Sequence, residues 1–560
     1  MIKRLAITVS GAVSLGSYEA GVMFEMLDAI KQHNNDPATA AAGDYIKIDV
    51  ITGASAGGMT ATILAQKLLF EAASLDGAYA NCLYRPWVND VDIVGLLNMH
   101  GDDDAKKSIL SSQLVDDISV RYLTARYSAH VDLPVDRHAA GADKISLGLA
   151  LSNLNGVDYG LGLRPTGEFV YTKHQDQLTI QVDGTRPADF DSLDQWEPLR
   201  RAALSCGAFP FAFKLVDLYR TVADYPPVPP RVTSILPGQR FTYTDGGTFQ
   251  NEPLGMAKNL VDQIDNHRNT DSRFYLYVSP SSKDPKAVSD DNFNAGNADY
   301  VSVAGRLLLS IFEQARFQDW VEAESINEKI ALFNARAAEL RDGFLKPAGT
   351  PGALKEADLK PMTDALLPML FSRDAVAPAK EADRLREQFA QEYRDVANGA
   401  GASAADEFIS ALLTLETAAQ IGRYDEMKIY GITAQDGELA SWELAAFAGF
   451  FDRSYRDHDY DVGRRKAQEF LNNQAIAQPG EIGPIRFTPQ PIRPIDGSLD
   501  GLKLEDMDRS VREKVRDRVR DRIFEVLKEI GVEGFVWGPI VREGIDLALV
   551  TPELNKVLKL

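Results

Sequence analysis

The stretch that decides the fold is IDVITGASAGGMTATILAQKLL, residues 48–69. Its β-branched start predicts a buried strand, and its apolar second half, Met59–Leu69, predicts a helix. The turn between them has the pattern G-x-S-x-G, with Ser55 bracketed by Gly53 and Gly57. A sharp strand-to-helix turn pushes its central side chain out of the packed layer and needs glycine where a Cβ would collide. The pattern predicts a nucleophilic serine, and a tight packing turn is the alternative.

Strands and helices alternate through the first half of the chain. Leu5–Val9 predicts a first strand and Gly21–Ile30 a helix, followed by the strand and helix around Ser55. Further strands are predicted at residues 145–154, 169–173, 178–182, 241–247 and 272–280. This alternation predicts an α/β fold in which a sheet is layered with helices.

The composition changes after about residue 280. Residues 281–300, SSKDPKAVSDDNFNAGNADY, predict a polar linker or long loop. Beyond them, Val301–Arg341 and Glu381–Asn398 predict long amphipathic helices, and MKIYGITA at 427–434 predicts a strand. A chain of 560 residues is too long for one compact core. We therefore expect an α/β domain at 1–280 and a mainly helical domain at 281–560.

Charge and composition exclude several classes of protein. The net charge of -21 argues against nucleic acid as a partner, because phosphate binding needs clustered Lys and Arg. No apolar run approaches the roughly 18 residues of a membrane span. The two cysteines, Cys82 and Cys206, predict neither a disulfide framework nor a metal site. The run GDDDAKK at 101–107 lacks the ligand spacing of a calcium loop, so we expect no metal.

The N-terminal stretch MIKRLAITVSGAVSLG superficially resembles a secretory signal, with a basic start and an apolar run. Because Leu5–Val9 is predicted to be a core strand, its removal would damage the fold. We therefore expect no cleavable signal peptide and a cytoplasmic location.

A nucleophilic serine needs a base and donors for the oxyanion that forms on its substrate. The loop SGAVSLGSYEAG at 10–21 follows the first strand and opens a helix, so its N–H groups suit developing negative charge. Gly11 and Gly16 permit a close approach there. In FTYTDGGTFQNEP, residues 241–253, Asp245 ends a strand, and Gly246 and Gly247 follow it. Such a turn aims a carboxylate over the edge of the sheet.

Together these three elements resemble the patatin-like phospholipases. That family combines a glycine-rich oxyanion loop, a G-x-S-x-G serine and a D-G-[AG] aspartate in this chain order. The segment ALSCGAFPFAFKLV at 203–216 is similar to the family's approach to the aspartate loop. FAGFFDRSYRDHDYDVGRRKAQEFL at 447–471 resembles a C-terminal segment of some bacterial patatin-like proteins.

The resemblance implies a patatin-like three-layer fold, with helices on both faces of the sheet and a mainly helical C-terminal region. It implies that Ser55 is the nucleophile and Asp245 its only base. The N–H groups of Gly11, Ala12 and Ala56 would form the oxyanion hole. The expected activity is that of a phospholipase A or esterase on lipid esters, with no cofactor. No protein activator can be identified from the sequence.

One position departs from the family pattern. The family loop usually carries a basic residue where this chain has Leu15, and it has two more glycines. The missing charge could weaken stabilisation of an anionic intermediate or mark a different substrate. A lipid-binding relative without activity, and an acyltransferase, are therefore kept as alternatives.

A Ser-His-Asp triad is a rival interpretation, because His267 and His458 follow Asp245 in the chain. The segment around His267 is typical of a polar surface, and that around His458, RDHDYD, is typical of a structural ion pair. Cys206 has no histidine near it in sequence, so a buried free thiol is expected. A Ser-Asp dyad should lose activity in the acid range, without a histidine titration.

Residues 507–523 predict a helix with an apolar residue at every fourth position, and the chain from 509 to 522 is locally basic. A basic, amphipathic helix suits peripheral contact with an anionic membrane. The same stripe would also suit packing on the domain, with Arg/Asp pairs on the outside. We favour packing.

Overall fold

The computed structural model describes residues 2–128, 136–163, 167–225, 238–265, 272–282, 318–344, 427–435, 437–442, 446–473 and 481–529, with single residues and pairs elsewhere up to residue 560. The chain forms two compact units. The first contains residues 1–260, 271–319 and 429–560, and the second contains residues 261–270 and 320–428.

A mixed sheet forms the centre of the first unit. Its described strands follow the order β5-β7-β3-β2-β1-β8-β9, and β4 and β6 each pair with β3. The parallel part consists of β1 (Lys3–Val9), β2 (Ile46–Gly53), the start of β3 (Gly141–Leu163), β8 (Arg273–Ser282) and β9 (Ile429–Gln435). The antiparallel part adds β4 (Gly167–Asp183), β5 (Val216–Arg220), β6 (Arg231–Val232) and β7 (Gln239–Thr244).

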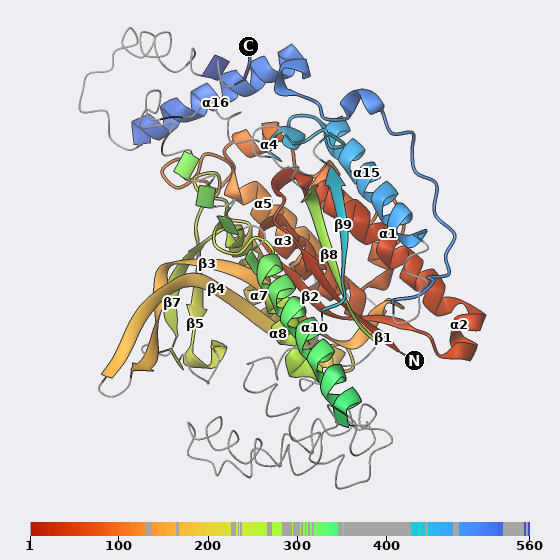
Figure 1. Cartoon of the computed structure of the whole chain (residues 1–560). Coiled ribbons are helices and arrows are strands. Elements are labelled where there is room, and N and C mark those ends of the chain that lie inside the picture. Colours follow the sequence, from red (N-terminus) through yellow and green to blue (C-terminus); the bar gives the residue numbers. More distant parts are fainter. Residues whose placement is uncertain are drawn as a thin grey trace. The chain divides into compact units, whose positions relative to one another are not determined.

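Helices cover both faces of this sheet (Figure 1). The described helices in this unit, wholly or in part, are α1 (Gly16–Asn35), α2 (Pro37–Ala42), α3 (Ser55–Phe70), α4 (Ile93–Leu97), α5 (Ser112–Ser119), α6 (Ala125–Ser128), α7 (Leu193–Cys206), α8 (Leu254–Asp265), α15 (Arg453–Leu471) and α16 (Arg509–Glu529). Right-handed crossovers from β1 through β2 to β3 place α1 and α3 on one face. Helix α8 follows β7, which runs antiparallel to β3, and its Met256 and Leu260 side chains lie against Gly148 of β3. This patatin-like α/β arrangement is the predicted fold class.

The register of the sheet gathers three loops at one edge. Val9, the last residue of β1, pairs with Gly53, the last residue of β2. On the antiparallel side, Thr244 at the end of β7 pairs with Ser152 of β3. The segments after β1, β2 and β7 therefore begin side by side. They are the three segments that the sequence singles out.

Helix α15 packs directly on α1 through two glycines. A Cβ on Gly21 would lie 2.1 Å from the Tyr460 carbonyl oxygen, and one on Gly463 would lie 2.2 Å from the Tyr18 carbonyl oxygen. Next to this contact, the buried Arg464 guanidinium lies 2.9 Å from the Glu25 carboxylate. Figure 1 shows the two helices side by side although they come from opposite ends of the chain. The close approach explains why glycine is needed at both positions.

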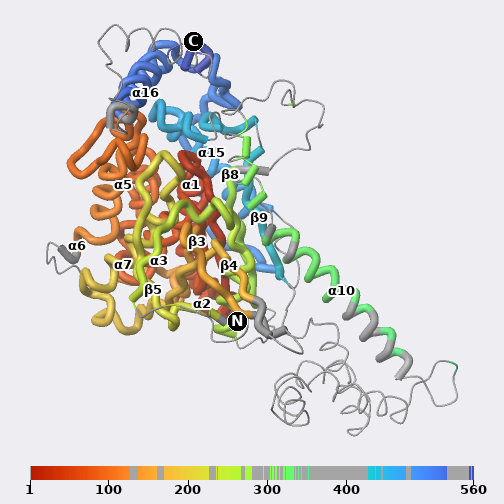
Figure 2. The backbone as a smooth tube through the Cα atoms, turned by 90° about the vertical axis from the view of Figure 1, so that its left-hand side faces the viewer, coloured from red at the N-terminus to blue at the C-terminus, as the bar shows by residue number. Residues whose placement is uncertain are grey.

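The apolar stripe of α16 is used in packing. Val511, Val515 and Val519 belong to one hydrophobic cluster with residues of α4 and α5. Arg512 is buried and donates to the main-chain carbonyls of Glu505, Met507 and Leu558. Figure 1 and Figure 2 both show α16 above α5. The packing interpretation therefore accounts for the stripe.

The division into units differs from the predicted boundary at residue 280. Strand β9 and helix α15 lie after residue 280, yet they complete the sheet and helix layer of the first unit. The predicted helix 301–341 corresponds in part to α10 (Gln318–Phe344), whereas 381–398 lies outside the described residues. Most of the predicted linker at 281–300 also lies outside them. Within the described residues, no helix is both long and apolar enough to cross a membrane.

Candidate functional site

Ser55 is held in a strained turn at the start of α3. Its φ is +50°, a conformation that residues other than glycine adopt rarely. A Cβ on Gly53 would lie 2.4 Å from the Gly57 carbonyl oxygen, and one on Gly57 would lie 2.2 Å from the Ser10 carbonyl oxygen. Both glycines are therefore required by close backbone contacts. Backbone strain of this kind is common at functional sites, where the surrounding structure maintains it.

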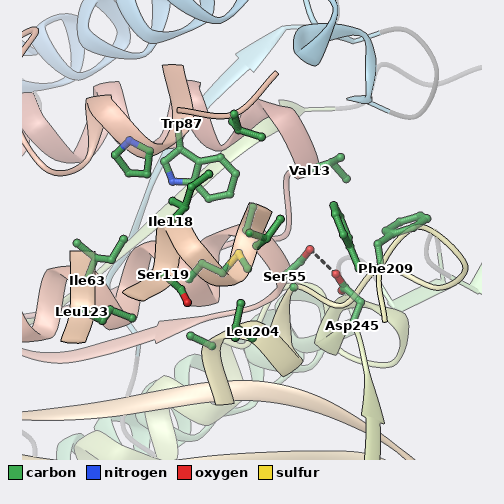
Figure 3. A pocket seen from close by; sticks show the side chains of 18 of the residues that line it. Val13, Ser55, Ile63, Trp87, Ile118, Ser119, Leu123, Leu204, Phe209 and Asp245 are labelled. Atoms are coloured by element: carbon green, nitrogen blue, oxygen red, sulfur yellow. Dashed lines mark hydrogen bonds between the residues drawn. The ribbon is translucent and has the colours of Figure 1, made fainter. Parts of the chain in front are cut away.

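The structure brings Asp245 to Ser55. The Ser55 hydroxyl donates a hydrogen bond to Asp245 Oδ2 at 2.6 Å (Figure 3). The other carboxylate oxygen accepts the Gly247 N–H at 2.7 Å, and the Asp245 N–H donates to the Ala208 carbonyl at 2.8 Å. A Cβ on Gly246 would lie 2.0 Å from the Ala150 carbonyl oxygen. The turn after β7 therefore fixes the carboxylate against the serine.

Burial changes the acidity of this carboxylate. Asp245 is fully buried, and this burial raises its pKa to about 7, against the opposing effect of the Ser55 and Gly247 hydrogen bonds. A general base works best when its pKa lies near the working pH. At neutral pH a large share of Asp245 is thus ionised and able to accept the serine proton.

The loop after β1 supplies fewer N–H groups than expected. The Gly11 N–H donates to the Asn251 main-chain carbonyl at 3.1 Å, so it is already engaged. In the described part of the chain, the Ala12 and Ala56 N–H groups make no hydrogen bond. Ala56 is the second residue of α3, where helix geometry leaves the N–H without an acceptor. Val13 adopts φ +50°, which is unusual for a β-branched residue.

Packing explains the residues at positions 15 and 16. Leu15 is buried in the main hydrophobic core, where a basic side chain would lack a partner. A Cβ on Gly16 would lie 2.7 Å from the Trp87 ring. Gly11 is similarly constrained, because its Cβ would lie 2.0 Å from Asn251 Oδ1. The departure at Leu15 thus has a structural cause in this chain.

A mostly apolar pocket opens beside the Ser55 hydroxyl (Figure 3). It contains about 870 Å³ of space, counted with its open mouth. The pocket is lined by Val13, Ser55, Ala56, Met59, Ile63, Pro86, Trp87, Val91, Val115, Ile118, Ser119, Leu123, Ala203, Leu204, Gly207, Phe209, Phe213, Asp245 and Phe450. A chamber with this lining suits a hydrocarbon chain whose carbonyl carbon lies at the serine.

Most residues that line the pocket are not indicated by the sequence, and neither is Asn251. Trp87 lies in a π-helical turn, Arg85–Asn89, and its indole N–H donates to Thr60 Oγ1 of α3 at 3.0 Å. Phe450 reaches the pocket from the segment before α15. Asn251 orients the loop at Gly11. The segment 447–471 is the available signal in the sequence, and it does not indicate a pocket without the fold.

The rival catalytic residues that the structure describes have other contacts. The His458 ring lies 3.1 Å from Asp459 and 2.9 Å from Asp500, in agreement with a structural ion pair. His267 lies outside the described residues. Cys206 is buried, and burial raises the pKa of its thiol well above the usual value. The thiol donates to the Gly53 carbonyl at 3.8 Å, two residues before Ser55 in the chain.

The structure gives no support to a metal site in its described part. Among those residues, no three His, Cys, Asp or Glu side chains are arranged to bind an ion. Asp103 of the acidic run instead accepts the Ser112 and Gln113 N–H groups at the start of α5.

Comparison with known proteins gives the family of this domain. Residues 7–258 match the family model described as patatin-like phospholipase. These residues form a patatin-like domain. The matched segment contains Ser55, Asp245 and the loop at Gly11, but it ends before β8 and β9. Members of this family are generally hydrolases.

The patatin-like domain also has a bacterial relative. An uncharacterized protein, y4iI, of Sinorhizobium fredii (strain NBRC 101917 / NGR234) is 22% identical over 441 residues. The alignment covers 65% of this chain and 60% of the relative. It is longer than the 7–258 segment, so the similarity extends beyond the patatin-like domain.

Proposed function

We propose that the protein is a serine acyl hydrolase that cleaves carboxylic ester bonds of lipids with a Ser55–Asp245 dyad. The observation that carries this proposal is the 2.6 Å hydrogen bond from the Ser55 hydroxyl to the buried Asp245 carboxylate. The apolar pocket beside it gives the acyl chain of such a substrate a place to bind. The family match supports the same class of chemistry.

The proposed first step forms an acyl-enzyme. Asp245 Oδ2 accepts the hydroxyl proton while Ser55 Oγ attacks the ester carbonyl carbon. The carbonyl oxygen becomes an oxyanion, and the N–H groups of Ala12 and Ala56 are the proposed donors that stabilise it. Gly11 allows the loop to approach closely, and its own N–H is not one of the proposed donors. The intermediate then releases the alcohol, which takes the proton from Asp245, and leaves the acyl group on Ser55.

The proposed second step releases the acid. A water molecule attacks the acyl carbon as Asp245 accepts one of its protons. Cleavage of the bond to Ser55 Oγ then frees the carboxylic acid, and Ser55 recovers its proton from Asp245. The chemistry is complete with these side chains and water, so no cofactor is proposed.

Active-site variants test this proposal. We expect Ser55→Ala and Asp245→Asn each to reduce hydrolysis of a soluble nitrophenyl ester and of phosphatidylcholine to background, since the two residues act as one unit. Ser119→Ala is a matched control, because Ser119 lines the same pocket but accepts a hydrogen bond from Arg200. A fluorophosphonate should label the wild type and Ser119→Ala, but not Ser55→Ala.

The outcomes separate the competing functions. Equal hydrolysis by the wild type and Ser55→Ala would remove the enzyme proposal. Lipid binding without any turnover would favour a lipid-binding protein that has the fold but no catalytic activity. The observation behind that alternative is the Gly11 N–H, which is already engaged by a main-chain carbonyl. Transfer of the acyl group to an added alcohol in preference to water would indicate an acyltransferase.

A further inference from the structure

A short turn at the pocket exposes an aromatic side chain. The Phe213 N–H donates to the Phe209 carbonyl at 3.0 Å, and both of these side chains line the pocket. Phe211 lies at the centre of the turn, with φ +66° and 72% of its surface exposed. A bulky residue with positive φ is an outlier, and glycine would be the unstrained choice. The chain thus maintains an exposed ring at an unfavourable backbone position.

A second loop runs beside this turn. The Ile109 N–H donates to the Phe211 carbonyl at 2.9 Å, and the Leu110 N–H donates to the Ala212 carbonyl at 2.8 Å. Ile109 and Leu215 are 39% and 41% exposed. We name Ile109, Phe211 and Leu215 the apolar rim. All three belong to the two loops that are joined by these hydrogen bonds.

The apolar rim has a rigid base. The buried Arg522 guanidinium of α16 donates to the Ser108 and Ile109 carbonyls, both at 2.8 Å. Leu110 and Phe213 pack below the rim in the cluster that includes Val515 of α16. Helix α16 therefore supports the two loops from inside. The side chains of the apolar rim are therefore exposed although the loops that carry them are held by buried contacts.

Lysines lie beside the apolar rim. Lys214 is exposed between Phe211 and Leu215, and Lys107 lies two residues before Ile109. Lys107 pairs with Asp104 at 3.1 Å, which partly offsets its charge. The chain as a whole carries a net charge of -21. Lys107 also follows the three aspartates at 102–104, so lysines and carboxylates both lie in the loops that expose the apolar side chains.

We propose that the apolar rim docks the protein onto a phospholipid surface, so that an acyl chain passes from that surface into the pocket. This inference rests on the proposed function, because it assigns the route of the substrate to the Ser55 pocket. Exposed apolar patches next to a binding site commonly mark an interaction surface. Phe211 would insert among the acyl chains, and Lys214 would remain at the phosphate level.

Vesicle binding tests the proposal directly. We use phosphatidylcholine vesicles and the Ser55→Ala protein, so that no lipid is consumed. Replacing Phe211 with Gly removes the ring and relieves the positive φ, so the fold should be retained. We expect bound protein to fall about tenfold, since burial of one phenylalanine contributes on that order. Binding should persist at high salt, because apolar contact dominates.

A matched control and a second variant complete the binding experiment. Val170→Ser changes an exposed apolar residue of β4, away from the rim, and should leave binding unchanged. The combined Ile109→Ser, Phe211→Gly and Leu215→Ser variant should bind less than Phe211→Gly alone. Equal binding by this combined variant and its parent, or no binding by the parent, would overturn the proposal.

Activity assays distinguish this inference from the proposed function. With Ser55 intact, Phe211→Gly should lose most hydrolysis of vesicle phospholipid but retain hydrolysis of a soluble short-chain ester. Absence of both activities in the wild type, with rim-dependent vesicle binding, would reject the hydrolase and keep the docking surface. Equal loss of both activities in Phe211→Gly would contradict the docking role.

Discussion

The folded state and the proposed chemistry favour different ionisation states of Asp245. A fully buried carboxylate is more stable when protonated, whereas the base in the proposed mechanism must be ionised. The Ser55 hydroxyl and the Gly247 N–H reduce this conflict by donating to the two oxygens. They do not remove it, since the pKa remains raised, to about 7.

The first prediction follows from this raised pKa. The folded state binds the Asp245 proton up to about pH 7, whereas the unfolded chain releases it near the usual value of 3.8. The stabilisation from this proton is complete below the unfolded pKa and is lost as the pH rises to about 7. Asp245→Asn should therefore raise the melting temperature more at pH 8 than at pH 4. An equal shift at both values would contradict burial of an ionising carboxyl.

The second prediction concerns activity and pH. Because Asp245 must be ionised, hydrolysis of a soluble ester should rise as the pH passes through about 7 and then level off. The sequence alone predicts a loss mainly in the acid range, and a pKa of about 7 for Asp245 moves the predicted loss toward neutral pH. His458→Gln in folded protein should retain most of the activity. A loss of about a thousandfold, as in triad disruption, would indicate a histidine base.

Some of these residue-level features could be predicted from the sequence and others could not. Ser55 and Asp245 were identified because glycines next to them specify tight turns, which is local information. The pKa of Asp245 depends on burial by distant segments, so no local pattern indicates it. The same holds for Gly11, whose N–H is engaged by Asn251, more than two hundred residues away.

At the level of elements, the contact between α1 and α15 gives the third prediction. A methyl group on Gly463 would collide with the Tyr18 carbonyl, so Gly463→Ala should force the helices apart. We expect a loss of about 1–3 kcal/mol, typical of overpacking. Urea unfolding measures it. Gly431→Ala in β9 is the control, because nothing lies within 4 Å of its added Cβ. Equal stability of the two variants would contradict the packing argument.

Helix α16 gives the fourth prediction, because its arginines differ in environment. Arg512 is buried against main-chain carbonyls, whereas the Arg509 side chain is 73% exposed. Arg512→Glu should destabilise the protein by several kcal/mol, since a buried charge would then face carbonyl oxygens. Arg509→Glu should have little effect. Thermal unfolding compares them, and equal effects would show that α16 is not packed as described.

The elements themselves were mostly predictable where hydrophobic periodicity is local. Strands β1, β2 and β9 and helix α3 lie close to their predicted positions. Helix α1 begins at Gly16, directly after the loop that was predicted to open a helix. The stripe of α16 indicated an amphipathic helix, but only tertiary structure shows that the stripe contacts α4 and α5.

For the whole molecule, the change in composition near residue 280 does not mark the end of the α/β unit. Strand β9 pairs in parallel with β8, with Tyr275 opposite Ile429. The chain between these residues contributes most of the second unit. Pairing across such a separation leaves no periodic signal in the sequence. The boundary at 280 was inferred from local composition, whereas the units are defined by long-range contacts.

The last prediction tests this organisation. A chain ending at residue 282 retains Ser55, Asp245 and β8, and contains the whole segment matched by the family model. It would lack β9, α15 and Phe450. Without β9, one edge of β8 is exposed. Without α15, the glycine face of α1 is uncovered and the buried Glu25 has lost Arg464. Loss of one partner of a buried ion pair alone costs about 3–5 kcal/mol. We therefore expect this shortened chain to aggregate or to bind a hydrophobic dye, without a cooperative unfolding transition.

Co-expression provides the control for the shortened chain. A second fragment, residues 429–560, carries the missing strand, helices and pocket residue. If the truncated protein fails because these elements are absent, co-expression should restore solubility, a cooperative transition and labelling of Ser55 by fluorophosphonate. The same fragment with Gly463→Ala should restore less, because α15 would then pack poorly on α1. A soluble, cooperatively folded and active chain that ends at residue 282 would show instead that the catalytic fold is complete without its C-terminal elements.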